Sequence, residues 1–409
     1  MASERSKLLN DIWAGTNLVL KSRDDLALWP EIQALEQCQQ DLEWHAEGNV
    51  LIHTDMVLSE CLAIEPELNP QQQKILRMSC LLHDIEKPKV TTFNTTINHV
   101  IAPGHERMGG VSSRYLLKEM FISNQDRRLV SELVATHHLI KRNVQNIDAP
   151  GGACMIDRLA ARVNTKLLWA LELADMRGRE SIGKDEQIEI VQLFKMLCEE
   201  RDIFGKPPVP WIHPNDIVKI PFANVEAANY ALKEAHRRRL LGTIGDPYHS
   251  LAFIHDQAKH QPADIIVTVG VAGSGKSTAI ENLSPEYERI STDGERKERY
   301  GSESILGDHG TIFQACAEKL RVVLRRGGKA VYDATNVVPD LRSKIVTLCH
   351  DYGAHVTLWV FDISKEELKR RNKQRDRQVP EEIIEKQCAK FEWPLPEEAH
   401  EMKVFDETY

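Results

Sequence analysis

Apolar residues recur at three- and four-residue spacing through the first half of the chain. The spacing is seen in MVLSECLAI, QQQKILRMSCLL, SSRYLLKEMF, RRLVSELVATHH and TKLLWALELADM. Because an α-helix turns once in about 3.6 residues, this spacing puts the apolar side chains on one face of each helix. Strand-like alternation is scarce there, and KVTTFNTTINHVIAPGH predicts a loop or short hairpin between helices. Residues 1–205 therefore predict an all-α helical bundle.

The pattern changes in the second half. IIVTVGVA is a continuous apolar run, typical of a strand buried on both faces of a parallel sheet. YERIST, KAVYDAT and AHVTLWVFD are further predicted strands, and TIFQACAEKLRVVLRRGG and LRSKIVTLCH are predicted helices between them. This alternation predicts a doubly wound α/β domain with a parallel sheet over residues 263–409. The proline-rich GKPPVPWIHPNDIVKIP and the helical ANVEAANYALKEAHRRRLL predict a linker and connecting helix over residues 206–262.

Composition agrees with two soluble domains. The 409 residues exceed what one hydrophobic core usually serves, and 42% of them are hydrophobic. The formal net charge of −9 gives no overall attraction to nucleic acid, so such binding would need local basic patches. The eight cysteines form no C-x-x-C pair, which indicates a reduced compartment without a zinc ribbon. No segment approaches the roughly 20 apolar residues of a membrane span, and the first 23 residues lack a signal-peptide core, so we expect a cytoplasmic protein.

A phosphate-binding loop follows the most apolar of the predicted strands. Residues 270–277 read G-V-A-G-S-G-K-S and fit the pattern G-x-x-x-x-G-K-[ST] before a predicted helix. The glycines let the backbone amides wrap phosphates, Lys276 reaches the β- and γ-phosphates and Ser277 holds Mg²⁺. The sequence thus predicts an NTP, ATP or GTP, bound with Mg²⁺ by Gly270, Gly273, Ser274, Gly275, Lys276, Ser277 and Thr278.

Polar residues follow the next two predicted strands, at the edge where α/β proteins bind ligands. Asp293 is placed to orient or deprotonate an acceptor hydroxyl, and Arg296 could grip a phosphate or the acceptor. Asp333 could position an arginine or a metal-bound water, although it could also have the structural role of a helix N-cap. Further on, Arg371 and Arg375 lie four residues apart on one face of a predicted basic helix. On a lid over the nucleotide, they could neutralise charge on the transferring phosphoryl group.

These residues resemble the polynucleotide 5′-kinase family. That family pairs the P-loop with S/T-x-D-x-x-R, here at residues 291–296, and with an R-N-x-x-R lid, here at residues 371–375. The resemblance covers about residues 264–395. It implies that Asp293 is the general base for a 5′-hydroxyl and that Arg296 contacts the acceptor strand end. It also implies that Arg371 and Arg375 clamp the NTP phosphates.

Histidines and carboxylates recur on separate predicted helices of the first half. The candidate ligands are His53, His83, Asp84, His105, His137, His138 and Asp175. Imidazole with carboxylate suits a transition metal such as Mn, Co, Ni, Fe or Zn, and not a Mg²⁺-only site. Two such metals could activate a water and stabilise a phosphate displacement. A lone buried histidine is more often a core residue, but an ordered set is a stronger signal.

This half resembles the HD phosphohydrolase superfamily, in particular the HD domain of bacterial tRNA CCA-adding enzymes. The similar segments are HAEGNVLIHT, LLHDIEKP, APGHERMGG, VATHHL and ELADMRGR. The resemblance places one metal on His53, His83, Asp84 and Asp175, and a second on His105 with His137 or His138. Lys87 takes the family's H-D-x-x-K position, where it could contact substrate phosphate. His45 could be a further polar contact, and a structural role is at least as plausible.

Together the two halves resemble the bacterial HD-Pnk end-healing enzymes. The resemblance implies that the HD domain opens 2′,3′-cyclic phosphates and removes the remaining phosphate, while the kinase phosphorylates 5′-OH ends. Expected partners are RNA or DNA strand ends and a nucleotide donor, with a functional link to a nucleic-acid ligase; a homodimer is compatible with the sequence. Residues 236–239, H-R-R-R, could add positive surface, although a solvated helix face is the commoner explanation.

Two other functions fit part of the pattern. A small-molecule P-loop kinase fused to an HD nucleotidase would also use Asp293 and Arg296, but the R-N-x-x-R lid disfavours it. A non-enzymatic switch, in which NTP only gates a nucleic-acid-binding HD module, would not need Asp293. The full set of candidate catalytic residues in both halves favours an enzyme.

Overall fold

A computed structural model describes residues 2–20, 23–120, 122–149, 151–302, 309–375 and 377–407. The chain divides into two compact units, Met1–Pro208 and Val209–Tyr409, each described here by itself. The segment predicted as a linker, residues 206–262, falls mostly in the second unit. Among the described helices, none combines the length and the apolar character that crossing a membrane requires.

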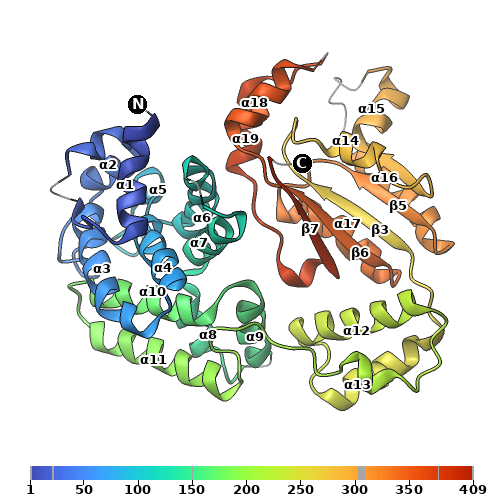
Figure 1. The fold of residues 1–409 in the computed structure, drawn as a ribbon, viewed down its shortest axis with the longest axis horizontal. Helices are drawn as coiled ribbons and strands as arrows, with labels where there is room; N and C mark the ends of the chain where they lie inside the picture. Colours follow the sequence, from blue (N-terminus) through green and yellow to red (C-terminus); the bar gives the residue numbers. More distant parts are fainter. Residues whose placement is uncertain are drawn as a thin grey trace. The chain divides into compact units, whose positions relative to one another are not determined.

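The first unit is helical, as the spacing of its apolar residues predicts (Figure 1). One core of Leu, Ile, Val, Trp and Cys side chains, running from Leu8 to Ile203, holds its helices together. Its helices are α1 (Ala2–Ala14), α2 (Pro30–Gln33), α3 (Val50–Ile64), α4 (Pro70–Leu82), α5 (Lys87–Val90), α6 (His105–Leu116), α7 (Asn124–Thr136), α8 (Leu139–Gln145), α9 (Gly152–Arg162), α10 (Thr165–Arg177) and α11 (Lys184–Glu200).

Side-chain caps fix where several of these helices begin. The oxygens of Asn49, Asn69, Ser123 and Asn164 accept the first free backbone N–H groups of α3, α4, α7 and α10. Helices α6 and α7 then approach closely at Gly110, where an added Cβ would lie 2.6 Å from the Cβ of Ala135. Only glycine permits this approach without moving one helix. This close approach brings the start of α6 near the end of α7, and both helix ends contribute residues to the candidate metal site.

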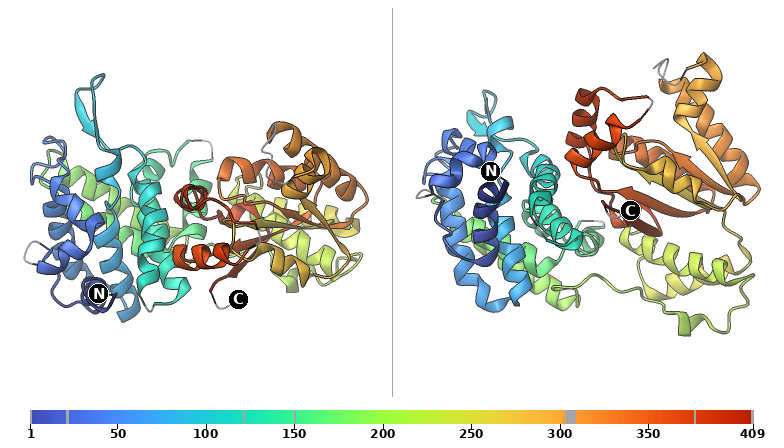
Figure 2. Two further views of the ribbon diagram at one scale, coloured as in Figure 1. Left: turned by 90° about the horizontal axis from the view of Figure 1, so that it is seen from above. Right: turned by 45° about the horizontal axis from the view of Figure 1, so that its top comes forward.

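The predicted hairpin in the first unit is confirmed. Strands β1 (Thr92–Asn94) and β2 (His99–Ile101) pair antiparallel, with Phe93 opposite Val100. Asp41 anchors the hairpin, because one carboxylate oxygen accepts hydrogen bonds from the His99 ring and the Val100 backbone. The hairpin projects beyond the helices around it (Figure 2).

The second unit is built on a five-stranded parallel sheet in the order β4-β5-β3-β6-β7. β3 is central and nearly fully buried, as its continuous apolar run predicts. Four of the strands were predicted; the edge strand β7, which pairs with β6, was not. The strands are β3 (Asp264–Val269), β4 (Tyr287–Ser291), β5 (Lys329–Asp333), β6 (His355–Phe361) and β7 (Glu401–Phe405).

Helices join the parallel strands and a helical pair precedes them. α12 and α13 share a small core of Ile217, Ala231, Ala235 and Ile254. The carboxyl ends of β3, β4 and β5 lead into the P-loop, into Ser291-Thr292-Asp293 and to Asp333, so the predicted kinase residues meet at one edge of the sheet. The helices are α12 (Val225–Leu240), α13 (Pro247–Asp256), α14 (Lys276–Glu281), α15 (Thr292–Tyr300), α16 (His309–Arg325), α17 (Pro339–Asp351), α18 (Lys365–Lys373) and α19 (Glu381–Ala389).

Candidate active sites

Helix ends gather the predicted metal ligands of the first unit. His53 lies in the first turn of α3, His105 begins α6, and Asp175 lies in the last turn of α10. His83 and His137 follow the last residues of α4 and α7. All five side chains are buried, with at most 5% of each residue exposed. Residues up to 122 positions apart thus share one polar site inside an apolar core.

Backbone carbonyls fix the orientation of three of the histidine rings. Nδ1 of His83, His105 and His137 donates to the carbonyl oxygen three residues earlier, at 2.8, 2.6 and 2.7 Å respectively. A carbonyl can only accept, so each Nδ1 carries the proton and each Nε2 keeps a free lone pair in the neutral ring. Such outer hydrogen bonds commonly set the tautomer of metal-binding histidines.

Asp84 lies between two groups of histidines and presents one oxygen to each. Oδ2 is 3.2 Å from Nε2 of His83 and 3.8 Å from Nε2 of His53. Oδ1 is 3.2 Å from Nε2 of His105 and 3.9 Å from Nε2 of His137. This arrangement would let one carboxylate bridge two cations held by different histidine pairs.

Asp175 completes the first of these groups. Its Oδ1 lies 3.0 Å from Nε2 of His53, and the Arg179 guanidinium grips both carboxylate oxygens at 3.0 and 2.5 Å. Arg179 was not among the predicted site residues. The only sequence signal for it is a basic residue one helical turn after a predicted ligand.

The protonation states suit metal binding. Burial alone would raise the pKa of the Asp84 carboxyl, but the nearby charges of His83 and Lys87 hold it well below its usual range. Burial would likewise raise the pKa of Asp175, and Arg179 and His53 hold it well below. Burial lowers the pKa of His137 to about 3, so this ring is neutral near pH 7. The carboxylates are therefore charged while the His137 lone pair is available.

Unsatisfied polar atoms support a metal at this site. Oδ1 of Asp84 and Nε2 of His105 and His137 are buried and make no hydrogen bond to any described residue, whereas Oδ2 of Asp84 is paired with the Lys87 ammonium. Buried polar atoms left in this way are costly unless a ligand or ion satisfies them. Ligand atoms of His53, His83 and Asp175 lie within 4.8 Å of one another, as do those of His105, His137 and His138. Nitrogen and oxygen donors together suit a transition metal.

The geometry separates the two adjacent histidines. His137 is fully buried and its Nε2 faces Asp84, whereas His138 is exposed and is the N-cap residue of α8. Both come within reach of His105, whose ring centroid is 5.3 Å from that of His137 and 5.1 Å from that of His138. His137 is therefore the better-placed ligand, and His138 lies at the outer side of the same group.

Lys87 and His45 surround the candidate metal ligands. Lys87 is 7% exposed, and its ammonium lies 2.7 Å from Oδ2 of Asp84 and donates to Gln40 at 2.8 Å. Burial lowers the pKa of His45 to about 4. Glu47, which was not predicted, joins His45 to the site, because its Oε1 lies 2.8 Å from Nδ1 of His45 and 3.0 Å from Nδ1 of His53.

The P-loop holds its lysine against its own backbone. Gly273 and Gly275 have φ of 83° and 95°, a left-handed conformation that favours glycine. Lys276 donates to the carbonyls of Gly270 and Val271 at 2.9 and 2.8 Å, and burial lowers its pKa to about 8. An arriving phosphate would compete with these carbonyls for the ammonium.

Arg289 connects Ser277, the residue expected to hold Mg²⁺, with Asp333. From β4, Nη2 donates to Asp333 at 2.6 Å and to the hydroxyl of Ser277 at 3.2 Å. Asp333, which is 7% exposed, thus positions an arginine, one of the two roles predicted for it. Arg289 itself was not predicted. These oxygens fit a hard cation, although Arg289 must turn away before Mg²⁺ can occupy this position.

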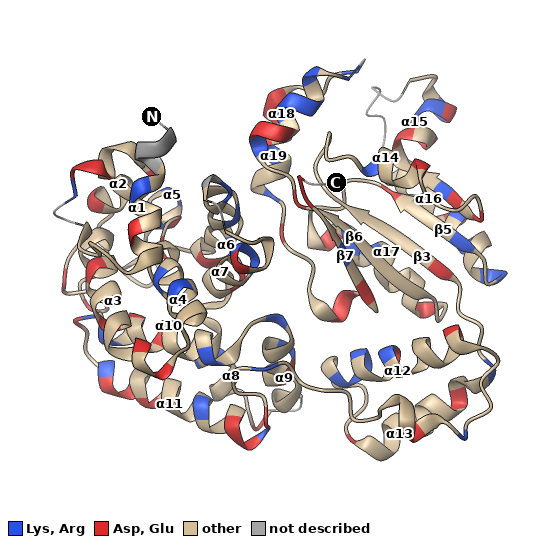
Figure 3. Ribbon diagram, in the orientation of Figure 1, with Lys and Arg blue, Asp and Glu red and all other residues tan. Residues whose placement is uncertain are grey.

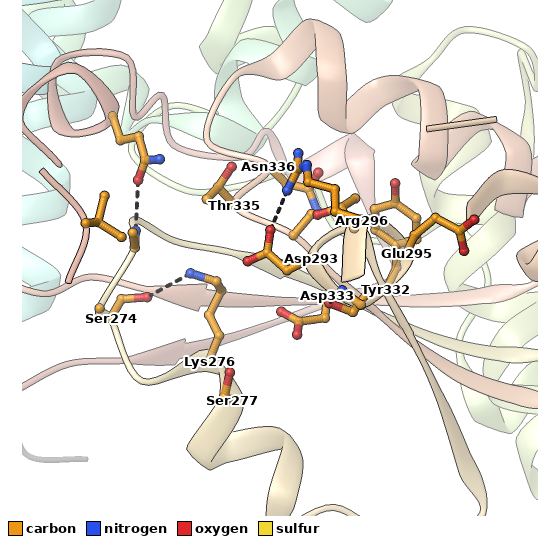
Figure 4. A pocket seen from close by; sticks show the side chains of 18 of the residues that line it. Ser274, Lys276, Ser277, Asp293, Glu295, Arg296, Tyr332, Asp333, Thr335 and Asn336 are labelled. Atoms are coloured by element: carbon orange, nitrogen blue, oxygen red, sulfur yellow. Dashed lines mark hydrogen bonds and ion pairs between the residues drawn. The ribbon is translucent and has the colours of Figure 1, made fainter. Parts of the chain in front are cut away.

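Asp293 and Arg296 form an ion pair in the first turn of α15. The hydroxyl of Ser291 caps this helix by accepting from the Gly294 backbone N–H at 3.3 Å. The Asp293 side chain is 58% exposed and Arg296 15%. Figure 4 shows both directed into the pocket that contains Lys276 and Asp333. Asp293 can therefore reach an acceptor from solvent while Arg296 supports it from the protein side.

The basic lid already touches the P-loop. Arg371 donates from Nη1 to the Ser274 carbonyl at 3.4 Å. The buried Asn372 bridges the lid, because its amide donates to the Val379 carbonyl at 2.8 Å and accepts from the Val379 N–H at 2.9 Å. Gln387 of α19 accepts from the Ala272 N–H at 2.8 Å. Basic residues concentrate along α18 (Figure 3).

One large cleft joins these elements. Its volume is about 2210 Å³, and P-loop, α15, β5 and lid residues line it, Arg375 among them. Among the described residues that line the cleft, nine are Lys or Arg and four are Asp or Glu, against a negative charge for the whole chain. The cleft is thus a local basic region suited to phosphorylated ligands.

The arginines of residues 236–239 make contacts with neighbouring side chains. Arg237 and Arg238 both donate to Glu234, at 2.6 and 2.8 Å, and Arg239 is 9% exposed with its guanidinium 4.4 Å from the Trp211 ring. The arginines are committed to contacts inside the second unit. The hypothesis that they add positive surface stays a prediction, because the Arg238 side chain is 40% exposed.

Two family models match separate parts of the chain. The model of the HD domain matches residues 50–176, and that of the AAA domain, AAA_33, matches residues 265–394. The first contains all the predicted metal ligands of the helical unit. The second runs from β3 through the P-loop and the lid.

Each of the similar proteins matches less than half of the chain. The A-adding tRNA nucleotidyltransferase of Deinococcus radiodurans is 25% identical over 204 residues, which are 47% of this chain and 44% of that protein. The multifunctional CCA protein of Psychromonas ingrahamii is 28% identical over 155 residues, 37% of this chain and 35% of that protein. The chain thus spans less than half the length of the curated relatives it matches.

Among solved structures, a chain of the Pnkp1/Rnl/Hen1 RNA repair complex is 24% identical and has a TM-score of 0.30. That match covers 32% of this chain and 45% of the other. The family matches and the parallel sheet agree on the architecture. Residues 50–176 thus match an HD domain within a helical first unit, and residues 265–394 match an AAA domain within the unit that contains the P-loop and the parallel sheet.

Proposed function

We propose that this chain heals the broken ends of RNA or DNA with two activities. The HD domain hydrolyses 2′,3′-cyclic phosphates and 2′- or 3′-phosphates, and the P-loop domain transfers an NTP γ-phosphate to 5′-OH ends. One observation carries the proposal: a histidine–carboxylate cluster and a basic cleft of about 2210 Å³ occur in the same chain. Small-ligand pockets are usually about 300–1,000 Å³, so this cleft has room for a nucleotide and a strand end.

In the HD domain, the charged and neutral ligands described above would hold the metals. Bound transition metals would supply Lewis-acid activation of water and of the phosphate. Asp84, with one oxygen toward each group of histidines, would be among the ligands, and Arg179 would hold the Asp175 carboxylate in place. The buried Lys87 would restrain Asp84 in the free enzyme. The exposed His138 lies on the side from which a phosphate could enter.

In the kinase domain, Asp293 would accept the proton of the 5′-hydroxyl as its oxygen attacks the γ-phosphorus. The bond from the γ-phosphorus to the bridging oxygen of the β-phosphate breaks, so that NDP leaves. Lys276, Arg371 and Arg375 would stabilise the phosphate charges, and Mg²⁺ would neutralise the remainder. Arg296, paired with Asp293, would orient that carboxylate and meet the acceptor.

The two reactions would together prepare both ends of one broken strand for joining. A strand cut by transesterification carries a 2′,3′-cyclic phosphate on one side and a 5′-OH on the other, and neither can be joined. Healing would yield a 3′-OH and a 5′-phosphate, the ends that a nucleic-acid ligase uses. The two curated relatives that match part of this chain are named for tRNA or CCA addition, which agrees with an RNA substrate.

The test uses an RNA with both broken ends, an NTP, Mg²⁺ and a series of transition metals. The wild type should process both ends. His83→Ala and Asp84→Ala should abolish phosphate removal and keep 5′ labelling, and Lys276→Ala should do the reverse. If the HD variants still open the cyclic phosphate, or Lys276→Ala still labels the 5′ end, the assignment of reactions to domains is wrong.

A small-molecule kinase fused to an HD nucleotidase is the competing function. A 5′-OH oligonucleotide and free nucleosides, offered together, separate the two. We expect the oligonucleotide to suppress nucleoside phosphorylation. Preference for a nucleoside over the oligonucleotide would contradict strand-end healing.

A further inference from the structure

Two backbone segments meet beside His53, the ligand on α3. Residues 45–47 precede α3 and residues 178–180 follow α10. The Ala46 N–H donates to the Glu180 carbonyl at 2.8 Å, and the Glu180 N–H donates to Oε2 of Glu47 at 2.9 Å. The Glu47 side chain is 1% exposed. It is therefore a buried carboxylate whose place is fixed by the backbone of the facing segment.

The second oxygen of Glu47 meets two histidine rings. Oε1 lies 2.8 Å from Nδ1 of His45 and 3.0 Å from Nδ1 of His53. The Gly178 carbonyl oxygen lies 3.3 Å from the same nitrogen of His53. Because a carboxylate and a carbonyl can only accept, Nδ1 of His53 carries the proton, and Nε2 keeps its lone pair in the neutral ring.

The opposite side of the His53 ring faces the other candidate ligands. Its Nε2 lies 3.0 Å from Oδ1 of Asp175 and 3.3 Å from Nε2 of His83. Nδ1 of His83 donates to the Cys80 carbonyl, so in the neutral rings two nitrogen lone pairs face each other. A bound transition metal would accept both lone pairs together with an oxygen of Asp175.

The charge at Nδ1 distinguishes His53 from the other candidate ligands. Nδ1 of His83 and of His137 donates to a neutral carbonyl. A carboxylate also approaches Nδ1 of His105, but it belongs to Glu106, lies at 3.4 Å and has a side chain that is 32% exposed. A buried carboxylate at 3.0 Å from Nδ1 makes the imidazole a stronger donor at Nε2.

We infer that Glu47 is a positioning residue of the HD domain, which holds the His53 ring and strengthens its Nε2 as a metal ligand. The inference rests on the proposed metal-dependent function and adds a residue to its site. Glu47 acts through His53 and does not itself touch the metal. It lies outside residues 50–176, the part of the chain that matches the HD family model.

The test is a calorimetric titration of the full chain with Ni²⁺, without nucleotide or nucleic acid. Glu47→Gln keeps the size of the side chain but has only one acceptor oxygen. Either the Glu180 N–H or the two ring nitrogens must then face the amide N–H groups. The Kd of one Ni²⁺ should rise by about 10- to 100-fold, while the number of bound ions stays the same. Glu47→Asp keeps the charge and should recover part of the affinity.

Two controls separate this role from folding and from a general loss of charge. Glu180→Gln removes an exposed carboxylate from the facing segment, whose backbone alone contacts Glu47, and it should bind Ni²⁺ like the wild type. Far-UV circular dichroism of the metal-free variants should match that of the wild type. With Co²⁺, the visible absorption bands should shift in Glu47→Gln and stay in place in Glu180→Gln, because only the first changes a ligand.

Several results would overturn the inference while leaving the proposed function intact. Glu47 does not act through His53 if Glu47→Gln binds Ni²⁺ as tightly as the wild type, or if Glu180→Gln loses as much affinity. Glu47 is itself a ligand if one bound ion is lost in both Glu47→Gln and Glu47→Asp. If Glu47→Gln does not fold, Glu47→Asp decides: its Kd should exceed that of the wild type several-fold, and an equal Kd would contradict the inference. If the wild type binds no transition metal, the proposed function of the HD domain fails as well.

Discussion

Single ionisable residues at the amino-terminal edge of the kinase sheet show how burial sets charge. The Glu234 carboxylate accepts hydrogen bonds from Arg237, Arg238 and His400. Burial alone would raise its pKa, but these partners hold it well below the usual range. His350 lies beside His400, with ring centroids 5.2 Å apart, and burial lowers its pKa to about 4. Glu234 therefore ties two arginines of α12 to His400 in one hydrogen-bonded network.

His350 predicts a loss of stability in mild acid. Its pKa is near 6.5 in the unfolded chain and lower in the folded one, so falling pH protonates the unfolded state first. Its contribution to stability is therefore complete above about pH 6.5 and declines down to about pH 4. His350→Gln should show a smaller drop in unfolding temperature between pH 7 and pH 5 than the wild type does. The exposed His255→Gln should keep the full drop, and an equal drop in all three proteins would contradict this role.

At the scale of elements, the lid depends on one buried amide. Asn372 ties the end of α18 to Val379 through two hydrogen bonds, and the P-loop lies against the same helix, since an added Cβ on Gly273 would lie 3.4 Å from the Leu368 carbonyl. The asparagine of the R-N-x-x-R motif therefore has a structural task. It shapes the segment that carries Arg375.

Replacing this amide should loosen the lid. Asn372→Ala removes both hydrogen bonds to Val379, at a cost of about 1 kcal/mol for each. We expect the KM for the NTP to rise several-fold and proteolysis between residues 372 and 379 to accelerate. Glu382→Ala, an exposed change on α19, is the control. Unchanged proteolysis and KM in Asn372→Ala would show that the lid holds its shape without this bridge.

Local sequence patterns predicted most elements but not those that depend on distant partners. Helical spacing and apolar runs were enough for α3, α4, α7, α10 and β3, because burial of one face or both faces imposes the pattern. The edge strand β7 was missed, since four of its five residues are not buried and its pairing with β6 is long-range.

The candidate sites follow the same rule. Residues of the P-loop and the H-D pair carry recognisable spacing. Arg289, by contrast, meets Asp333 from 44 positions away, and Glu47 meets the Glu180 backbone from 133 positions away. In the sequence, such a basic or acidic residue cannot be distinguished from a charged residue on the solvent-exposed surface, because its partner is distant along the chain.

For the whole molecule, the two candidate sites lie in different units. The core from Leu8 to Ile203 belongs to the first unit, and the parallel sheet with its P-loop belongs to the second. The metal ligands all lie in the first unit and all residues of the cleft lie in the second. Each ligand should therefore stabilise the unit that binds it.

Hydrogen exchange can test this separation. Ni²⁺ without nucleotide should slow exchange in residues 50–176, and Mg²⁺ with ATP should slow it in residues 265–394. At about 100 times its Kd, a ligand stabilises its folded unit by about 2.7 kcal/mol. His83→Ala should cancel the Ni²⁺ effect alone, and Lys276→Ala the ATP effect alone. Protection of residues 265–394 by Ni²⁺ would contradict the assignment of the metal to the HD unit.

The carbonyls that hold His83, His105 and His137 belong to Cys80, Ala102 and Val134, and none of these side chains takes part. Substitutions of those three side chains should therefore leave the orientations of the histidine rings unchanged, provided that the backbone conformation is kept. Related sequences should show invariant histidines preceded, three positions earlier, by residues of many kinds. A search based on conserved positions would find the histidine ligands but would overlook the residues whose backbone carbonyls orient them.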